Sequence, residues 1–461
     1  MINSLKTKPN IIAIGILALL ILARLALALL VDLHPQIAYK NSDTFDYVNM
    51  AESLALGKAY SLDSQEPLDL LRAPGYPLFL AAVFKVAGAS PGNVTLAQML
   101  VSTLTGYLLY RLIRLRFSQR TALLAFGLYL VDPTTILWGL PMLSETLFTF
   151  AVILAIYLAA LWLRRGKYYF LAMSGLAIGA GTLVRPIGQA YIAPLALLVL
   201  LRGAGSLQLK AMLKKNAPAV VYLIAGYLLL TAPWALRNKY VWDCPVVTTG
   251  PTINLRDWMV AKVVAEVDEI PLNQAINDLQ ATSDPICPTV NMEYIRILSQ
   301  HPRVFLKLYA GGTIATLFST SFDTGLQLFG VPYQLPDLWQ PYLDGGLAAV
   351  FKILINELPS RPLVPAGFIG LLIFQLSLYL LAAWGLVQGW RHIDADWRWW
   401  LLLISATIIL FLALPGPVGQ DRFRVPIQPL LVYLAVIPFE AKKPSQISPG
   451  KISASVKGDF L

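Results

Sequence analysis

The residues best suited to chemistry lie in an acidic stretch close to the N-terminus. Residues 32–72 hold seven acids and three bases, although the whole chain has 36 Lys and Arg against 26 Asp and Glu. Asp43 and Asp46 open a helical pattern there, because apolar residues recur at spacings of three and four between residues 47 and 54. A carboxylate held at this position can take a proton from an acceptor group. The alternative is structural, since both acids also fit the cap of a helix N-terminus.

Five arginines at the ends of apolar segments complement these acids. The planar guanidinium matches two oxygens of a phosphate group, so such a set suits a substrate with a phosphate leaving group. For each arginine alone, the alternative is a side chain that reaches toward lipid headgroups. The five are Arg72, Arg185, Arg237, Arg422 and Arg424, and we expect Arg72 and Arg424 to be the main phosphate ligands.

The composition indicates which medium surrounds these residues. Hydrophobic residues make up 57% of the 461-residue chain and charged residues only 13%, whereas a soluble domain has about 25% charged residues. Disorder, a fibrous repeat and an ordinary soluble enzyme are therefore excluded. We expect membrane lipid around the chain, and we interpret the net charge of +10 as basic cytoplasmic loops rather than as a nucleic-acid-binding surface.

Membrane-spanning segments must position the candidate residues. A spanning helix needs about 20 mostly apolar residues. Ten segments are candidates: Ile11–Val31, Val94–Tyr110, Thr121–Leu140, Thr146–Leu163, Tyr169–Val184, Pro186–Leu201, Ala217–Leu236, Gly367–Trp390, Leu401–Val418 and Val425–Phe439. The first is an uncleaved span, because its apolar core is longer than that of a signal peptide. Phe305–Thr320 is a further candidate that would need a partner such as Leu347–Leu358. The sequence predicts an all-α polytopic membrane protein of about 10 to 12 transmembrane helices.

Basic residues set the predicted orientation, because cytoplasmic loops are enriched in Lys and Arg. They precede the first span and follow the second, fourth and sixth, at residues 6–8, 111–120, 164–167 and 202–215. Ten spans then place both termini in the cytoplasm, with one transmembrane domain at 1–439 and a basic cytoplasmic tail at 440–461. The outer face receives loops 32–93, 237–302 and about 321–363. In the first of these, the segments 42–57 and 78–87 are too short to span and are expected to form interfacial helices.

The motifs of the first loop resemble those of a known family. Their order is an apolar span, then D-x-x-D-Y with A-x-x-L-x-x-G, then R-x-P-G-Y-P. Here these are Asp43, Asp46, Tyr47, Ala51, Leu54, Gly57, Arg72 and Pro74–Pro77. The pattern is similar to that of the integral-membrane GT-C glycosyltransferases, in the branch of dolichyl-phosphate-mannose protein mannosyltransferases and bacterial lipid A aminoarabinose transferases. Those mannosyltransferases carry an adjacent acidic pair in this loop, whereas Thr44 follows Asp43 here.

Later segments extend the resemblance over roughly residues 10–438. They have the family's order along the chain: Leu143–Phe148 before the fourth span, Leu183–Pro186 between the fifth and sixth, Pro233–Asn238 at the end of the seventh, Thr248 with Gly250, His301–Leu306, and Arg422–Pro429 at the last span.

The resemblance implies a GT-C-like bundle and a multi-pass enzyme of the plasma or inner membrane whose active site faces outward. It implies a hexosyl- or pentosyltransferase that moves a sugar, with inversion, from a polyprenyl-phosphate-linked donor to a protein, lipid or glycan acceptor. Asp43 would be the catalytic carboxylate, with Asp46 and Glu145 as further acids of the site and with Tyr47 and Tyr76 in the substrate loop. Glu145 also fits a structural position in the first turn of a helix.

Nothing in the sequence requires a cofactor. The three histidines are scattered, so no metal triad is expected. The sequence leaves open a divalent cation held by Asp43 and a donor phosphate. Cys244 and Cys287 fall in one predicted outer loop, where a disulfide between them would close 42 intervening residues.

Two other functions suit a hydrophobic chain of this kind. A transporter or flippase of a lipid-linked or small polar substrate would place essential polar groups at mid-membrane, whereas the spans predicted here are nearly free of charge. A non-catalytic assembly factor would tolerate the substitution Asp43→Asn.

Overall fold

The computed structural model describes residues 11–58, 60, 68–202, 209–331, 349, 352–353, 355–356, 363–391 and 395–440. Every regular element within these ranges is a helix, so the prediction of an all-α protein is confirmed. The predicted tail after Glu440 and most of the segment 347–358 lie outside the described residues.

Long helices and a folded first loop make up the N-terminal half of the chain. The first loop segment, residues 34–90, contains η1 (Pro35–Ile37), α2 (Asp43–Ala55), α3 (Leu68–Leu71) and α4 (Gly75–Ala87). The helices around it are α1 (Ile11–Leu33), α5 (Pro91–Arg114), α6 (Gln119–Leu130), α7 (Pro133–Leu137), α8 (Glu145–Arg165), α9 (Tyr169–Val184), α10 (Gly188–Leu200) and α11 (Leu209–Trp242).

Shorter helices follow before the chain returns to the bundle. The second loop segment, residues 243–301, contains α12 (Gly250–Ile253), the π-helical turn η2 (Asn254–Val260), α13 (Ala261–Val267), α14 (Leu272–Ala281) and α15 (Met292–Gln300). The remaining described helices are α16 (Pro302–Phe318), α17 (Phe322–Leu328), α19 (Leu363–Arg391), α20 (Ala395–Ala413), η3 (Gly416–Val418), η4 (Asp421–Ile427), α21 (Gln428–Ala435) and η5 (Ile437–Phe439).

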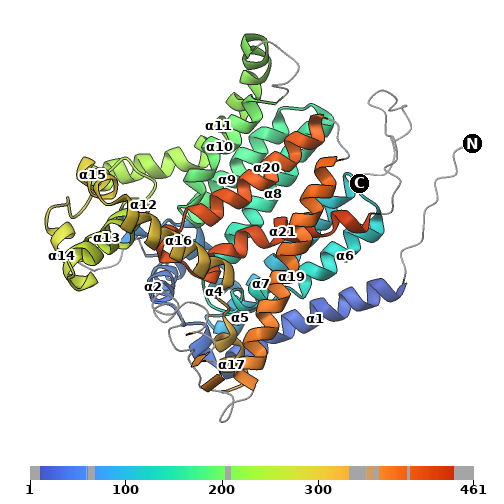
Figure 1. Cartoon of the computed structure of the whole chain (residues 1–461), viewed down its shortest axis with the longest axis horizontal. Coiled ribbons are helices and arrows are strands. Elements are labelled where there is room, and N and C mark those ends of the chain that lie inside the picture. The colour runs from blue at the N-terminus through green and yellow to red at the C-terminus, as the bar shows by residue number, and fades with distance from the viewer. Residues whose placement is uncertain are drawn as a thin grey trace, which may run out of the picture.

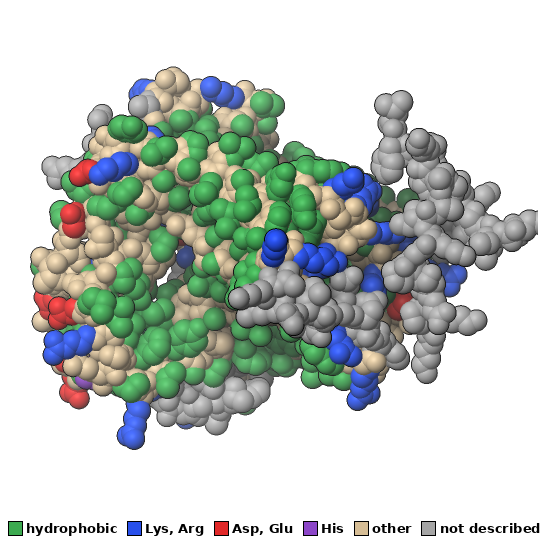
Figure 2. Space-filling view, turned by 90° about the horizontal axis from the view of Figure 1, so that it is seen from above, with side chains coloured by type: hydrophobic (Ala, Val, Ile, Leu, Met, Phe, Trp, Pro, Cys, Tyr) green, Lys and Arg blue, Asp and Glu red, His purple; other side chains and the backbone are tan. Residues whose placement is uncertain are grey.

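The apolar helices identify a multi-pass membrane protein. Within the described ranges, six segments are long and apolar enough to cross a membrane: α1, α5, α8, residues 213–242 of α11, residues 366–391 of α19, and residues 421–439. Shorter apolar helices are α4, α9, α10 and residues 397–413 of α20. Apolar side chains accordingly cover much of the surface in Figure 2, and Leu19, Leu29 and Leu380 on α1 and α19 are strongly exposed.

One predicted span is wrong as a single helix. The segment Thr121–Leu140 divides into α6 and α7, because a new helix begins at Pro133, which has no N–H to continue the first one. The Asp132 carboxylate caps α7 by accepting a hydrogen bond of 2.8 Å from the N–H of Thr135. The sequence pair Asp132-Pro133 is therefore a helix break, which hydropathy alone does not show.

The centre of the bundle is built on close helix packing. Figure 1 shows α8, α9 and α11 running side by side, and α9 packs against both neighbours. A Cβ at Gly175 of α9 would collide with the carbonyl oxygen of Leu223, and one at Gly226 of α11 with that of Ala172. These two glycines therefore let the backbones of α9 and α11 touch, as small residues do in membrane bundles.

A second hydrophobic cluster seats the first loop segment on the bundle. Its members come from α2, α4, α5 and the residues before α8, and include Tyr47, Val48, Ala51, Tyr76, Leu80, Val94, Met99, Met142 and Leu143. The amphipathic pattern of residues 47–54 therefore does form a helix, and its apolar face packs on protein. This packing fixes the start of α2.

One carboxylate connects the two ends of the first loop segment. Asp32, at the end of α1, accepts a hydrogen bond of 2.7 Å from the N–H of Gly92 in the first turn of α5. The helix N-terminus favours this negative charge. The two ends of the loop segment are thereby held together, and α1 packs along α5.

Candidate active site

Asp43 is the first residue of α2, and its carboxylate lies between two arginines. Oδ1 is 2.8 Å from Nη2 of Arg72, and Oδ2 is 3.2 Å from Nη1 of Arg422. The N–H of Asp43 is bound at 3.0 Å by the side chain of Asn41. The alternative interpretation of Asp43 as a helix cap is therefore wrong, since its carboxylate binds arginines instead.

Arg72 is held in place from several sides. Its Nε and Nη2 donate to Oδ2 of Asp46 at 3.0 and 2.9 Å. The guanidinium carbon lies 5.4 Å from the centre of the Tyr47 ring, and the Arg72 carbonyl accepts a hydrogen bond of 3.0 Å from the hydroxyl of Tyr60. The two acids of the D-x-x-D-Y motif thus share one arginine, and the tyrosine of the motif supports it.

A buried ion pair continues the cluster into the bundle. Glu145 opens α8, is only 1% exposed, and forms an ion pair with Arg185, which follows the last residue of α9. Arg185 also donates to the hydroxyl of Ser144 at 3.3 Å. Nε of Arg422 lies 3.9 Å from Oε1 of Glu145, so Arg422 bridges Asp43 and Glu145.

Aromatic and amide side chains support the charged groups. The Phe423 ring lies under the guanidinium groups of Arg185 and Arg422, whose central carbons are 5.6 and 5.0 Å from its centre. Tyr76 packs edge-on against Tyr47 and donates a 2.7 Å hydrogen bond to the buried amide of Gln98. The sequence patterns did not single out Phe423 or Gln98 as residues of this site. Phe423 lies within the Arg-Phe-Arg motif, but Gln98 is one of several uncharged polar residues on a mostly apolar helix and carries no local signal.

The structure reassigns two of the five predicted arginines. Arg424 is 2% exposed and donates to the carbonyls of Thr316 and Leu317, both at 2.9 Å, and to the hydroxyl of Thr134 at 3.3 Å. It anchors η4 to α16 and α7. These contacts do not support our expectation that Arg424 is a main phosphate ligand, whereas Arg422 pairs with Asp43.

Arg237 has different partners from the cluster arginines. Its guanidinium stacks 5.0 Å from the Trp234 ring centre and donates to the side chain of Asn238 at 3.0 Å and to the carbonyl of Tyr60 at 3.4 Å. Because the Tyr60 hydroxyl binds the Arg72 carbonyl, Arg237 supports the Arg72 segment through Tyr60.

The charges of the cluster balance. Three carboxylates face three guanidinium groups: Asp43, Asp46 and Glu145 with Arg72, Arg185 and Arg422. Burial would raise the pKa of Asp43, but Arg72, Arg422 and Arg185 outweigh it, so that the pKa of Asp43 lies below its ordinary value of 3.8. The site thus combines an ionised carboxylate with guanidinium groups that can bind an anion.

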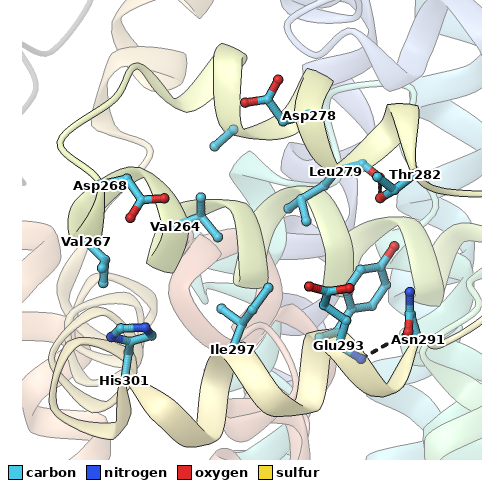
Figure 3. A pocket seen from close by; sticks show the side chains of 12 residues that line it. Val264, Val267, Asp268, Asp278, Leu279, Thr282, Asn291, Glu293, Ile297 and His301 are labelled. Atoms are coloured by element: carbon cyan, nitrogen blue, oxygen red, sulfur yellow. Dashed lines mark hydrogen bonds between the residues drawn. The ribbon is translucent and has the colours of Figure 1, made fainter.

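The second loop segment is cross-linked and contains a separate cavity. The structure joins Cys244 and Cys287 in a disulfide with a Cα–Cα distance of 5.6 Å. A cavity of about 300 Å³ lies between α13, α14 and α15, with Asp268, Asp278 and Glu293 around an apolar floor (Figure 3). None of the arginine–carboxylate cluster lines it.

This loop segment also contacts the active-site loop directly. The Thr248 hydroxyl donates to the Leu71 carbonyl at 2.7 Å, and the N–H of Thr249 donates to the Leu70 carbonyl at 3.0 Å. In the part of the chain that the structure describes, no group of three or more His, Cys, Asp or Glu side chains is placed to hold a metal ion.

Comparison with known proteins places the chain among membrane glycosyltransferase folds. The sequence model for dolichyl-phosphate-mannose-protein mannosyltransferase matches residues 71–241. No curated protein matches the sequence significantly. The apo oligosaccharyltransferase of Archaeoglobus fulgidus superposes with a TM-score of 0.52 at 13% identity, over 92% of this chain and 50% of that one.

Two further structures of that archaeal enzyme have lower scores. Its complex with zinc and sulfate has a TM-score of 0.49 at 14% identity, over 92% of this chain and 48% of that one. The enzyme with an inhibitory peptide and a dolichol-phosphate has a TM-score of 0.48 at 13% identity, over 92% and 50%. This chain spans about half the length of the enzyme it matches. The protein thus has the GT-C fold, and its residues 71–241 carry the sequence pattern of the dolichyl-phosphate-mannose-protein mannosyltransferase family.

Proposed function

We propose that this protein is a membrane glycosyltransferase that takes a sugar from a polyprenyl-phosphate-linked donor. The observation that carries the proposal is the position of Asp43 between Arg72 and Arg422. In this arrangement, a carboxylate that can act as a base lies beside two guanidinium groups that can bind a phosphate leaving group. The family match at residues 71–241, which includes Arg72, supports a donor of this class.

The transfer proceeds in one displacement. The acceptor nucleophile attacks the anomeric carbon as the bond from that carbon to the phosphate oxygen breaks, and the configuration inverts. Asp43 takes the proton of the nucleophile, and the bond electrons leave with polyprenyl phosphate. The phosphate gains negative charge as it leaves, so Arg72 and Arg422 stabilise the transition state more than the bound donor.

The site lies on the outer face, with both termini in the cytoplasm. The cluster residues come from the ends of elements: the start of α2, the start of α8 and the residue after α9. The basic connections lie at or after the C-terminal ends of α5, α8 and α10. The cluster lies near the opposite ends, at the start of α8 and just before α10. The disulfide in the second loop segment also suits an oxidising compartment. The acceptor is a protein, lipid or glycan of the cell envelope.

The transporter alternative is less well supported. A transporter would keep exchangeable polar groups at mid-membrane. Arg24, the charged residue in the middle of α1, is buried and donates to the carbonyls of Tyr129 and Leu130 at 3.2 and 3.3 Å and to Ser102 at 2.9 Å. It therefore fastens α1 to α5 and α6.

A transfer assay with purified protein tests the proposed function. Wild-type protein should transfer a radiolabelled sugar from one of a panel of polyprenyl-phosphate donors, and Asp43→Asn should reduce the rate by at least about 100-fold because it removes the base. The variant should still bind the donor and fold normally. Asp323→Asn is the matched control, because Asp323 pairs with Lys40 outside the cluster. Normal transfer by Asp43→Asn would exclude this mechanism.

A further inference from the structure

Both oxygens of the Asp43 carboxylate are already engaged. One is bound by Arg72 and the other by Arg422, and Arg72 also binds Asp46 through two nitrogens. A carboxylate that is held in two ion pairs is a poor proton acceptor. The same two arginines are the ligands that the donor phosphate needs, so Asp43 and the phosphate require the same donors.

We propose, on the basis of the proposed function, that the donor phosphate displaces Asp43 from Arg72 and Arg422, and that this exchange releases Asp43 as the base. The acidic side chains occupy the guanidinium groups until a phosphate replaces them. The base is therefore formed only in the presence of donor, and the donor binds before proton transfer from the acceptor begins.

The surroundings of Asp43 favour such an exchange. Asp43 is partly exposed, at 23% of its side chain, and so are Arg72 and Arg422, at 20% and 15%. A phosphate can therefore reach the guanidinium groups without unfolding the site. Arg72 remains supported by the Tyr47 ring, and Arg422 by the Phe423 ring, after the carboxylate leaves. The arginines thus keep their positions while their anionic partner changes.

The exchange also explains how a carboxylate with a depressed pKa can act as a base. Arg72 and Arg422 lower the pKa of Asp43 in the free protein. A phosphate bound to them offsets their positive charge, so the pKa of Asp43 rises toward its ordinary value in the complex. Tyr47 and Arg185 also act electrostatically on Asp43, and Glu145 lies near Arg422 on the other side of that guanidinium.

The affinity for polyprenyl phosphate tests the exchange. If Asp43 competes with the phosphate, Asp43→Asn should bind polyprenyl phosphate more tightly than wild type, by at least about fivefold, the lower end of usual coupling between linked binding events. The control Asp323→Asn changes the net charge equally but removes a partner of Lys40, and its affinity should match wild type. Fluorescence titration in detergent micelles measures all three proteins.

A second variant tests the exchange independently, in case Asp43→Asn fails to fold. Asp46→Asn removes the other carboxylate on Arg72 and should also tighten binding relative to Asp323→Asn. Unchanged affinity in both variants would overturn the exchange, and weaker binding would instead indicate that the carboxylates hold the phosphate through a cation. If the wild type transfers sugar but neither variant binds more tightly, the exchange fails while the proposed function stands. If the wild type binds no polyprenyl phosphate, both fail.

Discussion

Asp43 owes its ionised state to the guanidinium groups beside it. Its depressed pKa means that the ion pairs with Arg72 and Arg422 stabilise the folded protein above pH 3.8, the ordinary value, and that this stabilisation is lost as the pH falls through the lower folded-state pKa. Across the neutral range, the charge of Asp43 therefore does not change in the free protein.

This state predicts the pH dependence of transfer. Because kcat/KM reports the pKa values of the free enzyme, the acid limb due to Asp43 should lie below pH 3.8 in wild type. Arg422→Gln removes one cation and should shift that limb to higher pH, in addition to weakening donor binding. Lys307→Gln is the control, because Lys307 forms an exposed pair with Glu266. A pH profile that is the same in Arg422→Gln as in wild type would contradict the argument.

Residue types and motifs predicted which charged groups gather, but not every side-chain direction. The acids at positions 43 and 46 and the arginines at 72, 185 and 422 do converge. Arg422 and Arg424 could not be distinguished, since both stand in one motif. In η4, a helix with three residues per turn, side chains two positions apart point to different sides. The direction of Arg424 is determined by its hydrogen bonds to buried groups distant in the sequence, at residues 134, 316 and 317.

At the scale of the helices, hydropathy predicted most of the elements correctly. Apolar length is a local property, so α1, α5, α8, α9 and α10 begin and end near the predicted positions, whereas α11 extends beyond the predicted Ala217–Leu236 at both ends. Apolar length does not show the break between α6 and α7, because the break depends on Pro133 and on the capping of α7 by Asp132. The packing of α2 and α4 on the bundle depends on partners distant in sequence, and a single sequence does not reveal them.

The contact of α9 with α11 gives a prediction of stability. Gly226→Ala should lower the melting temperature in detergent by several degrees, because the added methyl group would collide with the backbone of α9 at Ala172. Gly370→Ala on α19 adds the same group where no atom lies within 4 Å, and it should leave the melting temperature unchanged or raise it slightly. Equal melting temperatures for the two variants would show that the close contact does not limit packing.

At the scale of the whole molecule, the cysteines of the second loop segment determine how the orientation of the protein in the membrane can be measured. Its two cysteines are paired and no other cysteine is present in the chain, so the native protein has no free thiol. In Figure 2 the acidic side chains gather toward the same end as α13–α15 in Figure 1. The orientation can therefore be measured with single introduced thiols.

Thiol labelling on intact cells should separate the two faces. Met292→Cys, on α15 and 75% exposed in the native protein, should react with a membrane-impermeant maleimide added outside. Lys167→Cys, in the basic connection after α8, should react only after the membrane is permeabilised. Wild-type protein should not react in either case while the disulfide is intact. The reverse pattern for the two variants would place the arginine–carboxylate cluster in the cytoplasm.

The hydrogen bond between Asp32 and Gly92 affects how the length of the first loop segment can change in evolution. The entropic cost of closing a loop grows only with the logarithm of its length, about 0.6 kcal/mol for each doubling. Here the packing of α1 on α5 and the hydrogen bond from Gly92 to Asp32 hold the two ends of residues 34–90 together. This contact does not depend on how many residues lie between the two helices. An insertion between α2 and α3 therefore need not disturb the contact of α1 with α5, whereas one within α2 or α4 would disrupt their packing in the second hydrophobic cluster. Over evolutionary time, the number of residues between Asp43 and Arg72 can therefore change while the membrane scaffold stays the same.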